Sequence, residues 1–231
     1  MPRNLILVAG HAIVRDFSRL TEDAGWFLLD FQRGEPTRYL GHIESAVRLA
    51  AADPNSLLIF SGGPTRLAAG PRTEALSYWL AAEHFGWWGH AETAARAHCE
   101  DFARDSFENL LFGLCRFEEL CGQAPAHVTF VSWEFKRQRF EDLHRAALHW
   151  PAERFTYVGA NDPPELAQAL AAEAQARAKY AADPYSASPE FQAKKQARNP
   201  FRRQHGYQTS CPHWFAPEHP WATTSGTATS A

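Results

Sequence analysis

The segment Leu57-Leu58-Ile59-Phe60-Ser61-Gly62-Gly63 decides the fold class of this chain of 231 residues. Its four apolar residues are preceded by a turn signal, Asp53-Pro54, and followed by glycine. A short apolar run with such borders is typical of a strand that is buried on both faces. Strands buried in this way occur mainly in parallel sheets covered by helices. The segment therefore predicts an α/β protein.

Short apolar runs alternate with helical patterns along most of the chain. Further strands are expected at residues 5–9, 94–99, 128–131 and 155–158. Helices are expected at residues 40–50, 73–84, 106–121 and 140–148, followed by an Ala-rich helix. This order predicts a three-layer α/β/α, Rossmann-like fold with a mostly parallel sheet.

Local signals predict where two of the helices begin or end. Asp105 and Glu108 have the spacing of a capping box with Asp105 at the N-cap, and Gly122 is typical of a helix C-terminus. Pro163 is expected at the first position of the Ala-rich helix, where its missing N–H has no partner to lose.

The regular pattern ends near Asp183. We expect residues 1–182 to form one α/β domain. Residues 183–221 are too rich in aromatic side chains for a purely disordered tail, so we expect them to pack on the domain as a C-terminal extension. Residues 222–231 are Ala, Thr, Ser and Gly and are expected to be disordered.

Composition argues against several classes of partner. The formal net charge is −3 and no basic run dominates, which argues against nucleic acid. Neither a signal peptide nor a transmembrane segment is visible, so we expect a soluble, cytoplasmic protein without a membrane partner. Cys211 lies near His205 and His219 in the sequence. Structural zinc sites usually show two paired ligand clusters, so we expect no metal.

Polar residues follow each predicted strand, at the edge where ligands bind in open parallel sheets. Those expected to contact a ligand are Gly10, Ser61, Gly62, Gly63, Thr65, Arg66, Glu74, Asp101, Glu134, Lys136 and Arg139. The N–H groups of Gly62 and Gly63 can line an anion site. Two glycines can equally turn the chain after a strand, and the motif alone does not decide between these roles.

Two residues are candidates for proton transfer. His11 comes directly after the first strand, although packing in the core would explain it as well. Glu100 follows the third strand and has no evident structural role in the sequence. No Gly-x-Ser-x-Gly elbow is present, so no covalent mechanism is assigned.

Three motifs follow one another in order: Ser61-Gly62-Gly63 with Thr73-Glu74-Ala75, Glu100-Asp101 with Ser106-x-Glu108-Asn109, and Val131-Ser132 with Arg139. Together they resemble the YdcF/SanA-like domain family of unknown function, over residues 4–160. Residues 10–13, 60–63, 65–66, 103–112, 134–137 and 198–201 are similar to its soluble, eukaryotic branch, and the last of these segments implies that the C-terminal extension belongs to the fold. The resemblance implies a Rossmann-like fold with a ligand site at the strand ends, to which Ser106 and Asn109 would also belong.

The resemblance implies little about the reaction, because the activity of this family is largely unassigned. Binding of S-adenosylmethionine has been associated with it, although not as a general property. This chain has Trp133 and Lys136 where bacterial members tend to have a small residue and His, so a bacterial activity does not transfer directly.

The first function that fits these residues is an enzyme acting on an anionic or phosphate-bearing small molecule. Arg66, Lys136 and Arg139 would hold the anion, because guanidinium and ammonium groups suit phosphate. His11 or Glu100 would move a proton.

The alternative is a non-catalytic module for a nucleotide-like ligand such as S-adenosylmethionine. Glu74 or Glu100 would lie near its sulfonium group, and Phe107 or Trp133 beside its adenine. A structural protein with a vestigial pocket ranks last, because many polar residues at the strand ends have no evident folding role.

Overall fold

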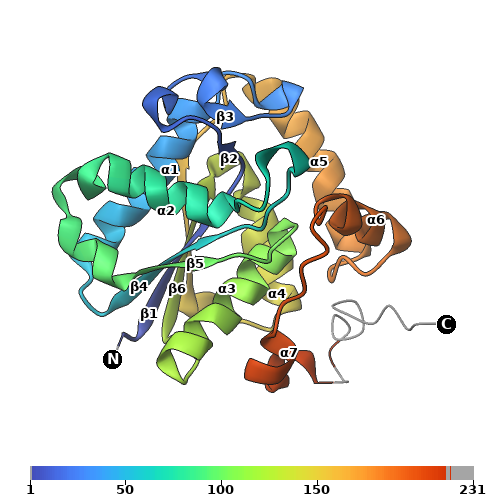
Figure 1. Ribbon diagram of the computed structural model, residues 1–231. Helices are drawn as coiled ribbons and strands as arrows, with labels where there is room; N and C mark the ends of the chain where they lie inside the picture. The colour runs from blue at the N-terminus through green and yellow to red at the C-terminus, as the bar shows by residue number, and fades with distance from the viewer. Residues whose placement is uncertain (1, 217–218, 220–231) are drawn as a thin grey trace.

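The computed structural model describes residues 2–216 and residue 219. Its strands are β1 (Asn4–Ala9), β2 (Ile13–Val14), β3 (Trp26–Phe27), β4 (Ser56–Ser61), β5 (Ala97–Glu100), β6 (His127–Trp133) and β7 (Phe155–Asn161). Its α-helices are α1 (Pro36–Ala52), α2 (Glu74–His84), α3 (Ser106–Cys121), α4 (Arg145–Ala147), α5 (Leu166–Ala182), α6 (Pro189–Ala197) and α7 (Tyr207–Ser210). Figure 1 shows their arrangement.

Five parallel strands form the central sheet, in the order β5-β4-β1-β6-β7. Strands β2 and β3 form a separate antiparallel pair. The chain adds β4 and β5 on one side of β1 and then returns to add β6 and β7 on the other side. The predicted parallel α/β sheet is therefore confirmed, and the strand order reverses between β1 and β6.

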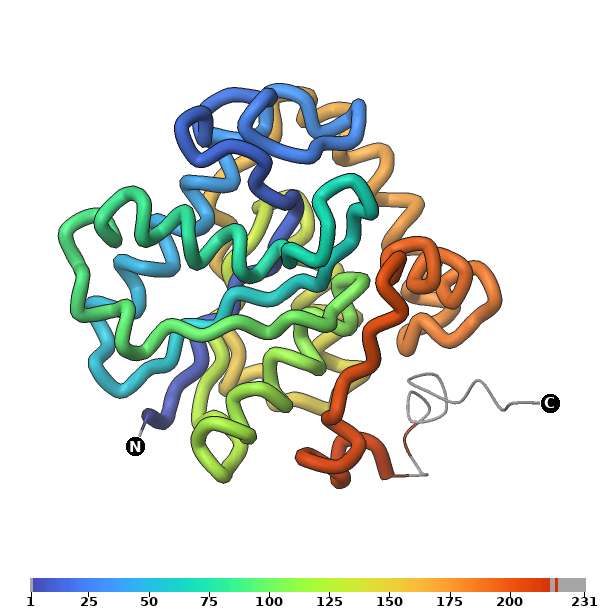
Figure 2. Tube along the Cα trace, viewed as in Figure 1, coloured from blue at the N-terminus to red at the C-terminus, as the bar shows by residue number. Residues whose placement is uncertain are grey.

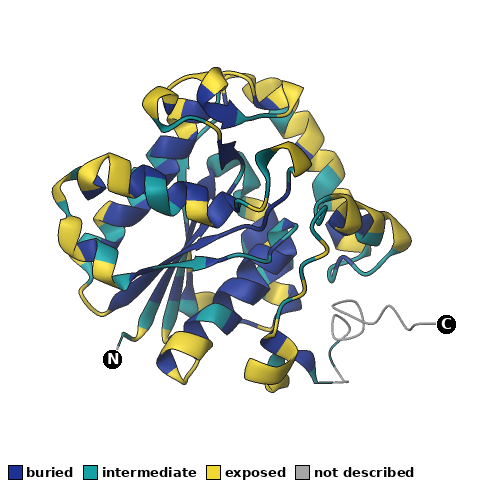
Figure 3. Ribbon diagram, in the orientation of Figure 1, coloured by how far each residue is buried: buried dark blue, intermediate teal, exposed yellow. Residues whose placement is uncertain are grey.

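Helices cover both faces of this sheet, as the alternation of side chains along β1 requires. Leu5 and Leu7 pack in a cluster with α3, whereas Ile6 and Val8 pack in a second cluster with α1 and α2. Both faces of the strands are buried (Figure 3). The predicted three-layer α/β/α arrangement is thus confirmed.

Helix α3 packs closely on β1 because Gly113 faces the sheet. A Cβ atom at this position would lie 2.4 Å from Cδ2 of Leu7. No side chain fits there without displacing Leu7, so glycine sets the distance between helix and strand.

The capping box at the start of α3 is half formed. The carboxylate of Asp105 accepts a hydrogen bond from the Glu108 N–H at 2.9 Å, which confirms the N-cap. Glu108 does not return the bond. Its carboxylate instead accepts from the N–H of Arg104 at 2.9 Å and pairs with the guanidinium of the same residue. Gly122 ends the helix in the left-handed conformation, with φ of 69°.

Several element boundaries differ from the sequence prediction, and three of these differences concern how an element begins or what kind of helix it is. Residues 91–96 form 3-10 turns, so β5 begins only at Ala97. The predicted helix at 140–148 is a π-helical turn, Arg139–His144, followed by the short α4. Its extra residue per turn leaves no clear mark in a short apolar pattern. The Ala-rich helix begins at Leu166 rather than at Pro163, since Pro164 disfavours a helical conformation of the residue before it.

The C-terminal extension runs from α6 along the side of α3 to α7 (Figure 2). Phe191, Tyr207, Cys211 and Phe215 are buried in the same cluster as Leu7. The extension therefore contributes to the core on one face of the sheet. Residues 222–231, predicted to be disordered, lie outside the described residues. Among those described, no helix is long and apolar enough to cross a membrane.

Candidate functional site

A cavity of about 450 Å³ opens at the carboxyl ends of β1 and β6. It is lined by residues 9–11 after β1, by Ser132 and Trp133 at the end of β6, and by the start of α3. One face of α5, the end of α6 and the loop around residues 31–35 complete its walls. The strand order reverses at this point, which is where ligands bind in open α/β sheets. The size is that of a small-molecule site.

The cavity brings together about half of the predicted site residues. Those that line it are Gly10, His11, Glu74, Ser106, Asn109, Lys136 and Arg139. Those that do not are Ser61, Gly62, Gly63, Thr65, Arg66, Glu100, Asp101 and Glu134. The four strand ends therefore do not contribute equally. The residues after β1 and β6 and the N-terminus of α3 face the cavity, whereas those after β4 and β5 mostly bond to one another.

Ser61 and Glu100 hold β4, β5 and α3 together behind the cavity wall. Ser61 donates a hydrogen bond to Glu100 at 2.6 Å and accepts one from Asn109 at 2.9 Å. The Glu100 carboxylate also accepts from the N–H of Phe102 at 2.8 Å. Glu100, predicted as a candidate for proton transfer, does not line the cavity; its carboxyl group is fully buried and fixes the loop that leads to α3.

Burial raises the pKa of Glu100 to about 7, against the opposing effect of the Ser61 and Phe102 hydrogen bonds. A raised carboxyl pKa means that the folded state holds a proton which the unfolded state releases. This contribution to stability is present below pH 4.5 and is lost as the pH rises through about 7.

Glu100→Gln should remove this pH dependence. We expect the unfolding free energy of the wild type, relative to that of the variant, to fall by about 3 kcal/mol between pH 4.5 and 8. Urea denaturation over this range measures the difference. Glu153→Gln, at an exposed position, is the matched control and should follow the wild type. Parallel pH curves for the wild type and Glu100→Gln would contradict the assignment.

The amides of Gly62 and Gly63 are not free to bind an anion, contrary to the prediction. Gly62 N–H donates to the Glu100 carbonyl at 3.0 Å, and Gly63 N–H donates to the Ala103 carbonyl at 2.8 Å. Gly62 has a φ of 151°, and a Cβ atom there would lie 2.8 Å from Oε2 of Glu74. Glycine is needed for this turn and for the close approach of Glu74.

The remaining strand-end residues are also bonded to neighbouring residues of the protein. Thr65 donates to Glu74, and Thr73 donates to Asp101. Glu134 pairs with Arg137 at 2.6 Å. Arg66, predicted to join Lys136 and Arg139 around an anion, donates to the Thr65 carbonyl at 3.2 Å and does not line the cavity. Its position in the sequence, soon after a strand end, did not reveal which way the loop turns.

His11 lies at the cavity wall among aromatic rings. Its Nε2 is 3.2 Å from Oγ of Ser132, and its ring centroid is 5.8 Å from those of Tyr39 and Trp133. Burial, assisted by the nearby charge of Lys136, holds the pKa of His11 well below its ordinary value. The imidazole is therefore neutral near pH 7.

Arg139 forms a buried ion pair with a residue that the sequence did not point to. Its Nη2 is 2.7 Å from Oε2 of Glu173 on α5, and both side chains are less than 10% exposed. The pair fixes α5 beside the turn after β6 and balances the charge of Arg139. Arg139 lines the cavity, but Glu173 already neutralises it.

Ser106 forms a contact with His144, which the sequence pattern did not predict. Its Oγ is 2.9 Å from Nε2 of His144 and 3.2 Å from the hydroxyl of Tyr180. Nδ1 of His144 is buried and has no partner among the described residues. An unpaired N–H costs more than an unpaired lone pair, so we assign the proton to Nε2. His144 then donates to Ser106 and is no base for it.

Two cations of the cavity come from the C-terminal extension. Lys194 and Arg198 line it from α6 and the residue that follows α6. Arg198 donates to the Arg104 carbonyl at 2.9 Å, which holds it beside the start of α3. Neither was predicted as a site residue; the resemblance carried by residues 198–201 indicated only that the extension belongs to the fold, not that it reaches the strand ends. Of the three cations Lys136, Lys194 and Arg198, only Lys136 was predicted from the sequence as a site residue.

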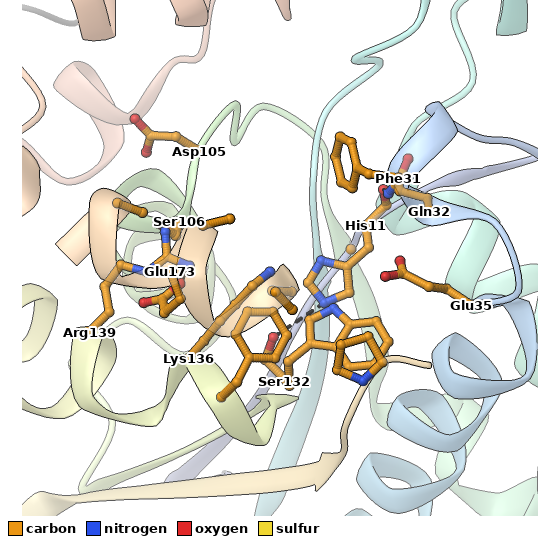
Figure 4. Close-up of a pocket in the computed structure, with 18 of the residues that line it drawn as sticks. His11, Phe31, Gln32, Glu35, Asp105, Ser106, Ser132, Lys136, Arg139 and Glu173 are labelled. Atoms are coloured by element: carbon orange, nitrogen blue, oxygen red, sulfur yellow. Dashed lines mark hydrogen bonds and ion pairs between the residues drawn. The ribbon is translucent and has the colours of Figure 1, made fainter. Parts of the chain in front are cut away.

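The opposite part of the cavity is aromatic. Phe31, Trp133 and Phe135 line it, with the carboxyl group of Glu35 beside them. Glu35 accepts a hydrogen bond from Tyr39 at 2.5 Å, and burial raises its pKa. Figure 4 shows Lys136 extending into the space between Arg139 and Glu173 on one side and His11 and Glu35 on the other.

Cys211, which lies near His205 and His219 in the sequence, is part of the protein core. Its thiol is buried and donates to the Cys115 carbonyl at 3.3 Å, and the ring of His205 packs 4.5 Å from that of Phe112. No group of three potential metal ligands occurs in the described parts of the chain.

The chain is similar over part of its length to the "Uncharacterized protein YOR238W" of Saccharomyces cerevisiae. The two are 31% identical over 121 residues. This region is 47% of the chain and 39% of the yeast protein, so the chain spans well under half of its relative. No family model matches the chain. No solved structure matches it either.

Proposed function

We propose that this protein is an enzyme that binds and converts a small anionic, phosphate-bearing molecule in the cavity at the ends of β1 and β6. One observation carries the proposal. Lys136, Lys194 and Arg198 line the same cavity, and none of them has a carboxylate partner within salt-bridge distance in the described part of the chain. Three unpaired cations facing one cavity suit an anionic group.

The start of α3 adds to this positive field. Ser106, the first residue of this 16-residue helix, lines the cavity, and the N-terminal end of a helix favours negative charge. Arg139 contributes less, since Glu173 balances it. His11, held neutral, is the group that would exchange a proton with the ligand. The likeness to the YdcF/SanA-like family, which also places a ligand at the strand ends, belongs to this proposal.

A second candidate is a non-catalytic module for a nucleotide-like ligand such as S-adenosylmethionine. The aromatic part of the cavity favours it, because Phe31, Trp133 and Phe135 offer ring faces for a base. Glu35 and Glu74 would then lie near the sulfonium group, whereas Glu100 and Phe107 do not line the cavity.

Calorimetry with adenosine 5′-phosphate, inorganic pyrophosphate and S-adenosylmethionine tests both candidates. We expect the phosphates to bind, and Arg198→Gln to weaken their binding about 10-fold, since a charged hydrogen bond contributes about 1.5 kcal/mol or more. Lys179→Gln removes the same charge from a residue that pairs with Glu190 outside this cavity, and should bind as the wild type does. Equal binding by Arg198→Gln and the wild type would argue against the anion site. Heat from S-adenosylmethionine alone would favour the second candidate.

A further inference from the structure

We propose that Lys136 is a nucleophilic amine that forms an imine with a carbonyl ligand carrying an anionic group, the class to which aldehyde and keto phosphates belong. This inference rests on the proposed anion site. It adds a covalent role for one lysine and narrows the class of ligand.

Lys136 is placed as such a role requires. It stands in the 3-10 turn that follows β6, and its side chain reaches into the cavity beside the ring of Phe135, whose centroid is 5.4 Å from Nζ (Figure 4). Its ammonium has no hydrogen-bond or ion-pair partner in the described part of the chain. An amine without a hydrogen-bond or ion-pair partner is free to attack the carbonyl carbon of a bound ligand.

Two of the other three lysines of the chain are engaged. Lys195 is buried 3.3 Å from Glu108 and 3.6 Å from Asp105, and Lys179 pairs with Glu190. Lys194 lines the cavity but is exposed to solvent. Lys136 therefore combines a position inside the cavity with a free amine.

The surroundings of Lys136 lower the pKa of its ammonium group, so that the neutral amine is available beside the cationic form near neutral pH. Burial lowers its pKa, and the positive charges of Arg139 and Arg198 lower it further, whereas Glu173 and Glu35 act in the opposite direction. A lysine that is desolvated next to other cations is a common form of activated amine. Arg198 and Lys194 would hold the anionic group and turn the carbonyl toward Nζ.

The step balances within the ligand and the lysine. The lone pair of Nζ forms a bond to the carbonyl carbon, and the carbonyl electron pair moves to oxygen, which takes up a proton. The nitrogen loses both of its protons in the course of the reaction, the oxygen leaves with two protons as water, and the nitrogen lone pair forms the second bond to carbon. The product is an imine between ligand and lysine, which returns to the free amine by hydrolysis.

Pyridoxal 5′-phosphate, an aromatic aldehyde phosphate, is the probe. The protein is incubated with it at pH 7, the imine is reduced with borohydride, and the modified lysine is found by peptide mapping. We expect one ligand per chain, on Lys136, and a slower reaction on Lys194, which is exposed to solvent. Mapping of the wild type identifies the lysine without any variant.

Two variants and a second probe separate the outcomes. Lys136→Arg has no reactive amine, so it should lose the adduct. Lys179→Arg should react as the wild type does. Binding of the probe without an adduct on Lys136, or adducts mainly on Lys194, would overturn the amine while leaving the anion site. Pyridoxal without phosphate should react far more slowly. Equal reaction would overturn the anionic ligand class together with the proposed function.

Discussion

Lys195→Met is expected to lower the free energy of unfolding by about 4 kcal/mol. The ammonium of Lys195 is 2% exposed and lies near two buried carboxylates, 3.3 Å from Glu108 and 3.6 Å from Asp105. Glu108 keeps its pairing with Arg104 in the variant, but Asp105 is left as a buried charge without a cation. The same substitution would loosen α6 from the start of α3.

Chemical denaturation at pH 7 measures this loss. Lys194→Met is the matched control, because it changes the neighbouring, exposed residue in the same way and should alter stability by no more than about 0.5 kcal/mol. Equal stability of Lys195→Met and Lys194→Met would show that the buried ammonium does not stabilise the extension.

The change of stability at acid pH also reports on the contact between Lys195 and Asp105. Burial alone would raise the pKa of Asp105, but Lys195 and the Glu108 N–H outweigh it and hold this pKa at about 2. The folded state thus favours the ionised form, which contributes stability above about pH 4 and loses it as the pH falls through 2. In Lys195→Met this loss toward acid pH should become smaller, because protonating Asp105 would then relieve an unpaired charge.

Arg139→Met should also cost about 4 kcal/mol, because it leaves Glu173 buried without its partner. The double variant Arg139→Met/Glu173→Met should recover most of this loss, since two apolar side chains replace a buried ion pair at little net cost. Denaturation of the three proteins forms a double-mutant cycle.

Arg137→Met is the control for the removal of a guanidinium. Arg137 lies two residues before Arg139 and pairs with Glu134 and Glu141, but it is about one-third exposed. Its loss should cost no more than about 1 kcal/mol. If the double variant were as unstable as Arg139→Met, the cost would come from lost packing rather than from an unpaired carboxylate.

The sheet could be predicted from the sequence because each buried strand is a local apolar run. The four residues from Leu57 to Phe60 supply apolar side chains to both faces of β4. The turn signals on either side of them limit the length of the strand. The cap at Asp105 could be predicted for the same reason, since its partner Glu108 is three residues away. The second hydrogen bond of the capping box, from the Asp105 N–H to Glu108, does not form, because the guanidinium of Arg104 is a stronger partner for the Glu108 carboxylate.

The site was harder to predict, because its walls come from segments far apart in the sequence. The location at the strand ends followed from the fold class, and Lys136 and His11 were found there. Glu100 looked free because its partners, Ser61 and the amides of its own loop, become neighbours only when β4 and β5 pair. Glu173 carries no local signal, and the resemblance carried by residues 198–201 did not give Arg198 a role in the site. Their roles depend on how α5 and the extension pack against the sheet.

The origin of Lys194 and Arg198 has a consequence for the order in which the protein is made. Every strand of the sheet has been synthesised by Asn161, before either of these cations exists. Domains generally begin to fold from the N-terminal side during synthesis. A nascent chain with a completed sheet would therefore hold a shallow, less positive hollow where the finished protein has its cavity. Under the proposed function, the anionic ligand could bind only after α6 has docked, so the docking of α6, rather than the completion of the sheet, would determine when the cavity is competent.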